Sequence, residues 1–181
     1  TNSGNEISLK NSKLDINENE YRYVSIETKI KMGSETHANQ FSIPYIKDSK
    51  GNTAYTLYAD GNWSSYKSHV NGKNTLEAGK ISVDKWQDIR MDIDLKKDTF
   101  RVTIDGECEL AGVNARAKTD NLSEISFYAD SWNTGTIYID SVEVTAEKER
   151  TQSATFYVSN NGDDSKAGTS PETAWKSLDK V

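Results

Sequence analysis

The stretch WQDIRMDIDLKKDTFRVTIDG at residues 86–106 decides the fold. In its first half, apolar residues from Ile89 to Leu95 alternate with charged ones, which is the two-residue period of a β-strand with one face on a core. Residues 99–104 alternate in the same way after a polar turn at residues 96–98. Because a lone hairpin is at best marginally stable in water, this stretch predicts an amphipathic hairpin that a second sheet covers.

The rest of the first 146 residues repeats this pattern. Residues 21–32 give the cleanest further strand, in which Val24, Ile26 and Ile30 alternate with polar residues. Other strand patterns recur roughly every ten residues, and no convincing helical period appears. We therefore predict an all-β fold, an antiparallel β-sandwich over residues 1–146, with Trp86 as a core tryptophan at the start of the central hairpin.

Charge and cysteine content exclude several classes of partner. The 181-residue chain carries 28 acidic and 22 basic residues, a net charge of -6, which argues against nucleic acid or an anionic membrane as the main partner. No apolar run is long enough to span a bilayer. Cys108 is the single cysteine, so there is no intrachain disulfide and no thiolate zinc cluster, and we expect a buried, reduced thiol.

The composition changes near the C-terminus. Residues 147–153 are charged and polar and predict a linker. Residues 154–181 then give a strand, a loop rich in Asn, Asp, Gly and Ser, and a helix that Ser170 caps and Pro171 opens. In that helix Trp175 and Leu178 would lie on one apolar side, and the part of the protein that this side would pack against is missing from the sequence. We expect this segment to be the start of a second, truncated domain.

Residues 155–181, TFYVSNNGDDSKAGTSPETAWKSLDKV, resemble the opening of secreted right-handed parallel β-helix proteins of the pectate-lyase-like kind. In that family a strand, an NGDDS..GTS loop and a short capping helix lead into the first coil. The resemblance implies that residues 154–181 are the N-terminal fragment of a β-helix domain. It also implies a parent protein that is an extracellular polysaccharide lyase or glycoside hydrolase.

Residues 6–147 resemble a concanavalin A-like jelly roll of the laminin-G or carbohydrate-binding-module type. The W..I.M.IDL....F.VTIDGE hairpin and the closing strand IYIDSVEV at residues 137–144 carry this resemblance. Sugar-binding sandwiches commonly sit beside β-helix catalytic domains, and this is an analogy at the level of fold. Together the two resemblances imply a secreted or cell-surface protein, bacterial in origin.

Aromatic rings are the first candidates for a sugar site, because rings stack on the apolar faces of pyranoses. The alternative is that each ring merely packs the sandwich or its rim. Lys67, Lys73 and Arg116 are candidates to meet the carboxylates of uronic acids, although scattered cations are usually solvated surface. The predicted ligand-binding residues are Tyr58, Trp63, Tyr66, Lys67, Tyr128 and Trp132, with Trp63 and Tyr66 as the best pair.

A structural Ca2+ is a further expectation from the jelly-roll resemblance. Many carbohydrate-binding jelly rolls join an acidic residue near the first strand and an Asp of the last strand through Ca2+. Asp140 is placed like that Asp, and Glu6 is its expected partner, with backbone carbonyls as the remaining oxygen ligands. The alternative is that Asp140 caps a turn.

These observations predict a non-catalytic carbohydrate-binding module, with no catalytic residues of its own, that targets a C-terminal β-helix catalytic domain of the same polypeptide to its polysaccharide. Laminarinase-type catalysis is disfavoured because no Glu-X-Asp occurs in the chain. A jelly-roll lyase that uses Tyr66 and His69 as acid and base is a less favoured alternative. A structural or protein-interaction spacer is the other alternative.

Overall fold

The computed structural model describes residues 5–10, 14–34, 41–60, 65–72, 74–129, 136–149 and 155–178, with the backbone alone for residues 5–10 and residue 129. The chain divides into two units, Thr1–Glu149 and Arg150–Val181. This division falls within residues 147–153, the segment predicted to be a linker. No helix in the described part of the chain is long and apolar enough to cross a membrane.

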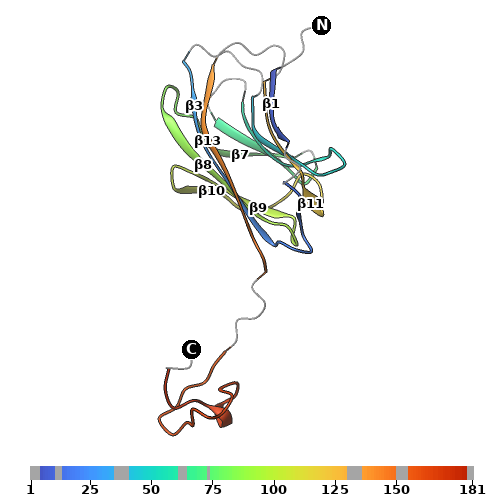
Figure 1. The fold of residues 1–181 in the computed structure, drawn as a ribbon. Coiled ribbons are helices and arrows are strands. Elements are labelled where there is room, and N and C mark those ends of the chain that lie inside the picture. Colours follow the sequence, from blue (N-terminus) through green and yellow to red (C-terminus); the bar gives the residue numbers. More distant parts are fainter. Residues whose placement is uncertain are drawn as a thin grey trace. The chain divides into compact units, whose positions relative to one another are not determined.

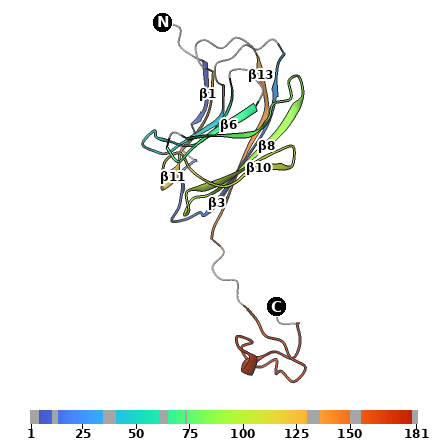
Figure 2. The same ribbon diagram turned by 180° about the vertical axis from the view of Figure 1, so that it is seen from behind.

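The first unit is a sandwich of two antiparallel sheets, which face each other in Figure 1 and, from behind, in Figure 2. Within the described residues, one sheet has six strands in the order β1 (Asn5–Lys10), β12 (Glu124–Ala129), β4 (Phe41–Lys47), β5 (Thr53–Ala59), β6 (Ser65–Val70) and β7 (Asn74–Lys80). The other has five, in the order β10 (Glu107–Asn114), β9 (Thr99–Ile104), β8 (Trp86–Asp94), β3 (Tyr23–Met32) and β13 (Ile137–Glu147). A short pair, β2 (Ile16–Asn17) with β11 (Asn121–Leu122), forms a separate two-stranded sheet whose Ile16 and Leu122 belong to the same core. The all-β sandwich prediction is confirmed.

The central hairpin forms from β8 and β9, as predicted. Ile89 pairs with Ile104 and Ile93 with Phe100, so the apolar residues of both strands share the inner face. All four side chains are buried. Asp105 and Gly106 then turn the chain with positive φ angles of 51° and 87°, the conformation that a tight hairpin turn requires. The alternation of the sequence therefore translates directly into one buried and one exposed face.

The core lies between the two sheets and is filled by aromatic and aliphatic side chains from both. Ile26 and Ile30 of β3 are buried, which confirms the second predicted strand. Tyr55 of the six-stranded sheet meets Phe100 of the five-stranded sheet edge to face, with ring centroids 5.7 Å apart. Such an edge-to-face pair stabilises beyond its buried area, so it helps to fix how the sheets stack.

Three local features go beyond the simple alternation of the sequence. Pro44 lies in β4 between two paired strands, at a register shift between Ser42 and Tyr45 that accommodates its missing N–H, which is one of the two places, edge or bulge, where a strand tolerates proline. The segment from Asn74 to Lys80 is strand β7, which pairs with β6 although its sequence has no alternating period. Cys108, predicted to be buried, is exposed in β10.

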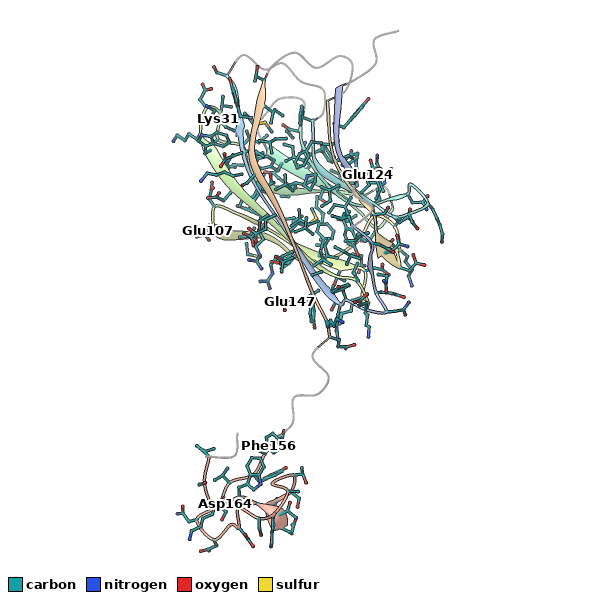
Figure 3. All side chains as sticks on the ribbon, in the orientation of Figure 1. Lys31, Glu107, Glu124, Glu147, Phe156 and Asp164 are labelled. Atoms are coloured by element: carbon teal, nitrogen blue, oxygen red, sulfur yellow. The ribbon has the colours of Figure 1, made fainter. Side chains whose placement is uncertain are left out.

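The second unit is a small fold around Trp175. The Trp175 ring stacks on Phe156 at 4.7 Å, and its indole N–H donates to the carbonyl of Lys166 at 2.7 Å. Val158 and Trp175 form a parallel bridge. Instead of the predicted helix, the described residues hold one turn of 3-10 helix at Pro171–Thr173. The carboxylate of Asp164, labelled in Figure 3, accepts from the backbone N–H of Lys176 at 2.7 Å, an interaction that replaces helical bonding.

Candidate functional site: the outer face of the six-stranded sheet

The outer face of the six-stranded sheet carries aromatic and polar side chains side by side. Directly opposed residues in antiparallel strands share a face, so the register decides which side chains meet. Tyr128 is opposite Ser42, Ser42 is opposite Tyr58, and Tyr58 is opposite Lys67. We call this surface the tyrosine–histidine face, defined by Tyr45, Tyr58, Lys67, His69 and Tyr128.

Tyr58 and His69 are the closest ring pair on this face. Their ring centroids are 4.7 Å apart and the planes are tilted by 33°. Tyr58 is only 3% exposed, although it does not belong to the core cluster between the sheets. The backbone N–H of His69 donates to Oγ1 of Thr56 at 2.9 Å, which anchors the histidine to β5. The prediction that the Tyr58 ring is open to stack on a sugar is therefore wrong. The ring instead packs against the imidazole of His69 and holds it in place.

The electrostatic surroundings of His69 keep its imidazole neutral. Burial lowers the pKa of His69 below its ordinary value of 6.5, and the positive charge of Arg116 lowers it further. Nδ1 of His69 lies 3.3 Å from Oγ1 of Thr75. A neutral imidazole is an acceptor as well as a donor, so His69 can accept a hydrogen bond or a proton from a bound hydroxyl or carbon acid.

Two cationic groups lie near this histidine. Lys67, predicted as a ligand-binding residue, is on the face, and its ammonium lies 3.2 Å from the carboxylate of Asp60. Arg116 lines a hollow of about 410 Å³ in which cations predominate. The charged side chains that line this hollow are Lys96, Lys97, Asp98, Arg116 and Lys118. Of these cations, Lys67 pairs with Asp60, Lys96 with Glu149 and Lys97 with Asp94. Arg116 is the cation whose charge acts on His69.

Tyr66 does not lie on this face. It is opposite Ala59, so its side chain points into the core, where it is fully buried and donates to Oε1 of Gln87 at 2.9 Å. The prediction of Tyr66 as a stacking ring is wrong. The alternative that pairs Tyr66 with His69 as acid and base also fails, because the two side chains project from opposite faces of β6.

One further ring, a weaker candidate from the sequence, lies on this face, and two predicted rings lie outside the described residues. Tyr45 is half-buried and lies opposite Thr56 and Ser126 on the tyrosine–histidine face, as Tyr128 does opposite Ser42. The register shift at Pro44 changes the parity of β4 between Ser42 and Tyr45, so both residues lie on this face. Trp63 and Trp132 lie outside the described residues.

The Ca2+ prediction depends on Asp140 and Glu6. Asp140 is exposed on β13, at a register shift, and Glu6 pairs by its backbone with Tyr128 from the outermost described strand of the other sheet. Among the described side chains, no three His, Cys, Asp or Glu residues gather around a common point. Ca2+ takes six to eight oxygen ligands, so the described side chains alone do not fit this ion. The site stays a prediction.

Comparisons with known proteins identify the fold. No protein-family model and no curated protein matches the chain. A solved sialidase is similar over 82% of this chain (TM-score 0.61, 8% identity), and the match spans 14% of the sialidase chain. CG-16, a homodimeric agglutinin from chicken liver, is similar over 78% of this chain and 100% of its own (TM-score 0.53, 10% identity). The alginate lyase AlyC3 in complex with dimannuronate is similar over 83% of this chain and 73% of its own (TM-score 0.56, 11% identity). At these identities the similarity shows the fold: residues 5–149 form a concanavalin-like jelly-roll β-sandwich.

Proposed function

We propose that the sandwich is a non-catalytic carbohydrate-binding domain whose tyrosine–histidine face binds a uronic-acid-containing polysaccharide. The observation that carries the proposal is the composition of this face, where the half-buried rings of Tyr45 and Tyr128 share one side of the sheet with His69, whose pKa is lowered by burial and by the charge of Arg116. Rings supply apolar contact with sugar faces, and the imidazole and cations supply hydrogen bonds to hydroxyls and carboxylates. The shared fold with an alginate lyase that holds dimannuronate supports the same class of ligand.

The proposal extends to targeting. The second unit, residues 155–178, folds around Trp175, and its sequence resembles the start of a β-helix polysaccharide lyase or glycoside hydrolase. Tethering a weak sugar-binding domain to such an enzyme would raise its effective concentration at a long polymer without new chemistry. In this role the protein acts outside the cell or at its surface.

Affinity electrophoresis of the whole chain in gels that contain polyuronates, sulfated glycans or neutral glucans tests the proposal. We expect retardation by a polyuronate, weakened about tenfold in dissociation constant by Tyr45→Ala or Tyr128→Ala. The predicted ring Trp63 is tested in the same way with Trp63→Ala. Tyr23→Ala is the matched control, because Tyr23 is 43% exposed on the opposite sheet. Absence of retardation in every gel would favour the spacer alternative.

A second candidate, a polysaccharide lyase, is favoured by the Tyr58–His69 pair. In β-elimination a neutral His69 would remove the proton from C5 of a uronate while the C4–O4 bond breaks and a C4–C5 double bond forms. The protonated His69 would return its proton to the departing O4, and Arg116 would neutralise the carboxylate. An absorbance assay for unsaturated uronate products tests this. Activity that His69→Ala abolishes would establish the lyase, and its absence with binding intact would establish the non-catalytic role.

A further inference from the structure

Three side chains form a straight row across the outer face of the five-stranded sheet. Trp86 of β8 is directly opposite Lys31 of β3, and Lys31 is directly opposite Tyr138 of β13. Adjacent strands lie about 4.8 Å apart, so the two rings flank the lysine at a separation of about 10 Å. Figure 3 shows Lys31 on the outside of this sheet, on the side away from Glu124 of the six-stranded sheet. We call these three residues the aromatic–lysine row.

The rings of the row are open to solvent. Trp86 is 44% and Tyr138 is 47% exposed. This exposure corrects the prediction that Trp86 is a core residue. Isolated exposed apolar side chains are ordinary, but a contiguous group on a hydrogen-bonded sheet marks an interaction surface. The strands beneath hold the row rigidly, because the alternate residues Ile30 and Gln87 are buried in the core.

Lys31 differs from its neighbours in how its charge is balanced. On the same face Arg90 pairs with Glu27 at 2.8 Å, and Lys29 pairs with Asp88 at 3.5 Å. The Lys31 ammonium instead lies 4.4 Å from the Tyr138 ring centroid and 5.4 Å from that of Trp86. Among the described residues it has no carboxylate partner. Cation–π contact orients an ammonium without neutralising it, so the row presents a positive charge between two apolar surfaces.

We propose that the aromatic–lysine row is a second glycan-binding surface, specific for acidic sugars, on the sheet opposite to the tyrosine–histidine face. Its rings would take the apolar faces of sugars along an extended chain, and the Lys31 ammonium would pair with a carboxylate or sulfate between them. A neutral glycan would leave that charge unused. A nucleic acid is disfavoured, because binding its regularly spaced phosphates takes several cations, whereas the row presents one.

The inference shares with the proposed function only the class of ligand, and either surface can bind without the other. If both bind, the domain is bivalent, so that one copy can hold two polysaccharide chains or two stretches of the same chain. The two surfaces are distinguishable by residue, because amide signals of β3, β8 and β13 report the row, and those of β4, β5 and β12 report the tyrosine–histidine face.

Titration of the 15N-labelled whole chain tests the proposal, with an oligouronate, a sulfated oligosaccharide and a neutral oligoglucan as separate probes. We expect saturable shifts of the Trp86 indole N–H and the Lys31 amide with an acidic probe. Saturation by the oligouronate identifies carboxylated sugars as the ligand, and saturation by the sulfated probe identifies sulfated ones. Trp86→Ala and Lys31→Gln should each raise the dissociation constant at these signals about tenfold.

Control variants keep the test interpretable. Lys31→Arg keeps the charge and should retain binding, Tyr23→Ala removes an exposed ring from the same face, and Tyr45→Ala alters only the other face. Shifts confined to the tyrosine–histidine face would overturn the inference and leave the proposed function intact. Equal shifts with the neutral probe that survive Lys31→Gln would overturn the acidic specificity. Self-association in sedimentation that Trp86→Ala abolishes would make the row a protein interface instead.

Discussion

Tyr66 and Gln87 join the two sheets through a hydrogen bond across the core. The phenol of Tyr66 donates to Oε1 of Gln87 at 2.9 Å, and the same oxygen accepts from the backbone N–H of Ser82 at 2.8 Å. The side-chain amide of Gln87 donates to Oδ2 of Asp105 at 3.1 Å. Every polar group in this buried network has a partner, so it fixes β6 against β8 rather than offering a ligand site.

Loss of the Tyr66 hydroxyl should destabilise the sandwich, whereas loss of the Tyr55 hydroxyl should not. Tyr66→Phe removes a buried hydrogen bond worth about 0.5–1.5 kcal/mol in the free energy of unfolding. The Tyr55 hydroxyl is also buried but has no hydrogen-bond partner among the described residues, so Tyr55→Phe should be neutral or stabilising. Urea unfolding of the two variants measures the difference. Equal losses of stability would contradict the assignment of these partners.

Stability should fall as the solution becomes acidic through the titration of His69. Because burial and Arg116 lower its pKa in the folded state below 6.5, the unfolded chain binds the proton more readily. The contribution of neutral His69 to the free energy of unfolding is therefore complete above the unfolded pKa and is lost as the pH falls through the lowered folded pKa.

Urea unfolding across a pH series that brackets 6.5 measures this loss. His69→Gln should flatten the dependence in that window, and His37→Gln, the control at the other histidine of the chain, should leave it in place. Arg116→Gln should move the NMR titration of His69 upward. An unchanged titration would show that Arg116 does not act on the imidazole.

The second unit should depend on a glycine at residue 168. Gly168 has a φ of +71°, and a Cβ there would lie 2.5 Å from the Trp175 ring. Gly168→Ala adds left-handed backbone strain of about 1–2 kcal/mol to this clash, so the Trp175 indole N–H should lose its hydrogen-bonded NMR position. Gly106→Ala is the matched control, because Gly106 has positive φ and open space around its Cα. A retained indole signal in Gly168→Ala would contradict the described packing.

The Ca2+ prediction gives a simple thermal test. If Asp140 and Glu6 hold the ion, CaCl2 should raise the melting temperature of the sandwich relative to EDTA by mass action. Asp140→Asn should abolish the difference, and Asp88→Asn, at another exposed carboxylate of the same sheet, should preserve it. Identical melting temperatures in CaCl2 and EDTA would show that no structural Ca2+ is bound.

Alternation of apolar and polar residues was sufficient to predict the architecture. The β8–β9 hairpin and β3 carry a strict two-residue period, so their buried faces follow from sequence. β7, the outermost described strand beside β6, does not follow from the sequence, because most of its residues are exposed and it has no such period. The alternation of β8 also indicates where Trp86 lies. Trp86 is on the same side of the strand as Asp88 and Arg90, and all three side chains are exposed.

The rings of the site were harder to place, because their environment comes from other strands. β6 has few apolar residues, so its sequence did not show that Tyr66 faces inward with Val70 while Lys67 and His69 face outward. The burial of Tyr58 depends on its contact with His69 from the neighbouring strand. The predicted helix failed because Asp164 binds the amides of Lys176 and Ser177, which a helix would have used.

The register shift at Asp140 has a consequence for how copies of the protein meet. β13 is the outermost described strand of its sheet, and it is 11 residues long. A long, regular border of this kind is a template on which another chain adds a strand, the first step toward cross-β aggregates. The extra residue between Ile139 and Ser141 breaks the regularity, and its charged side chain is exposed. Removing Asp140 would thus leave an uninterrupted border that favours fibril-like stacking at high concentration.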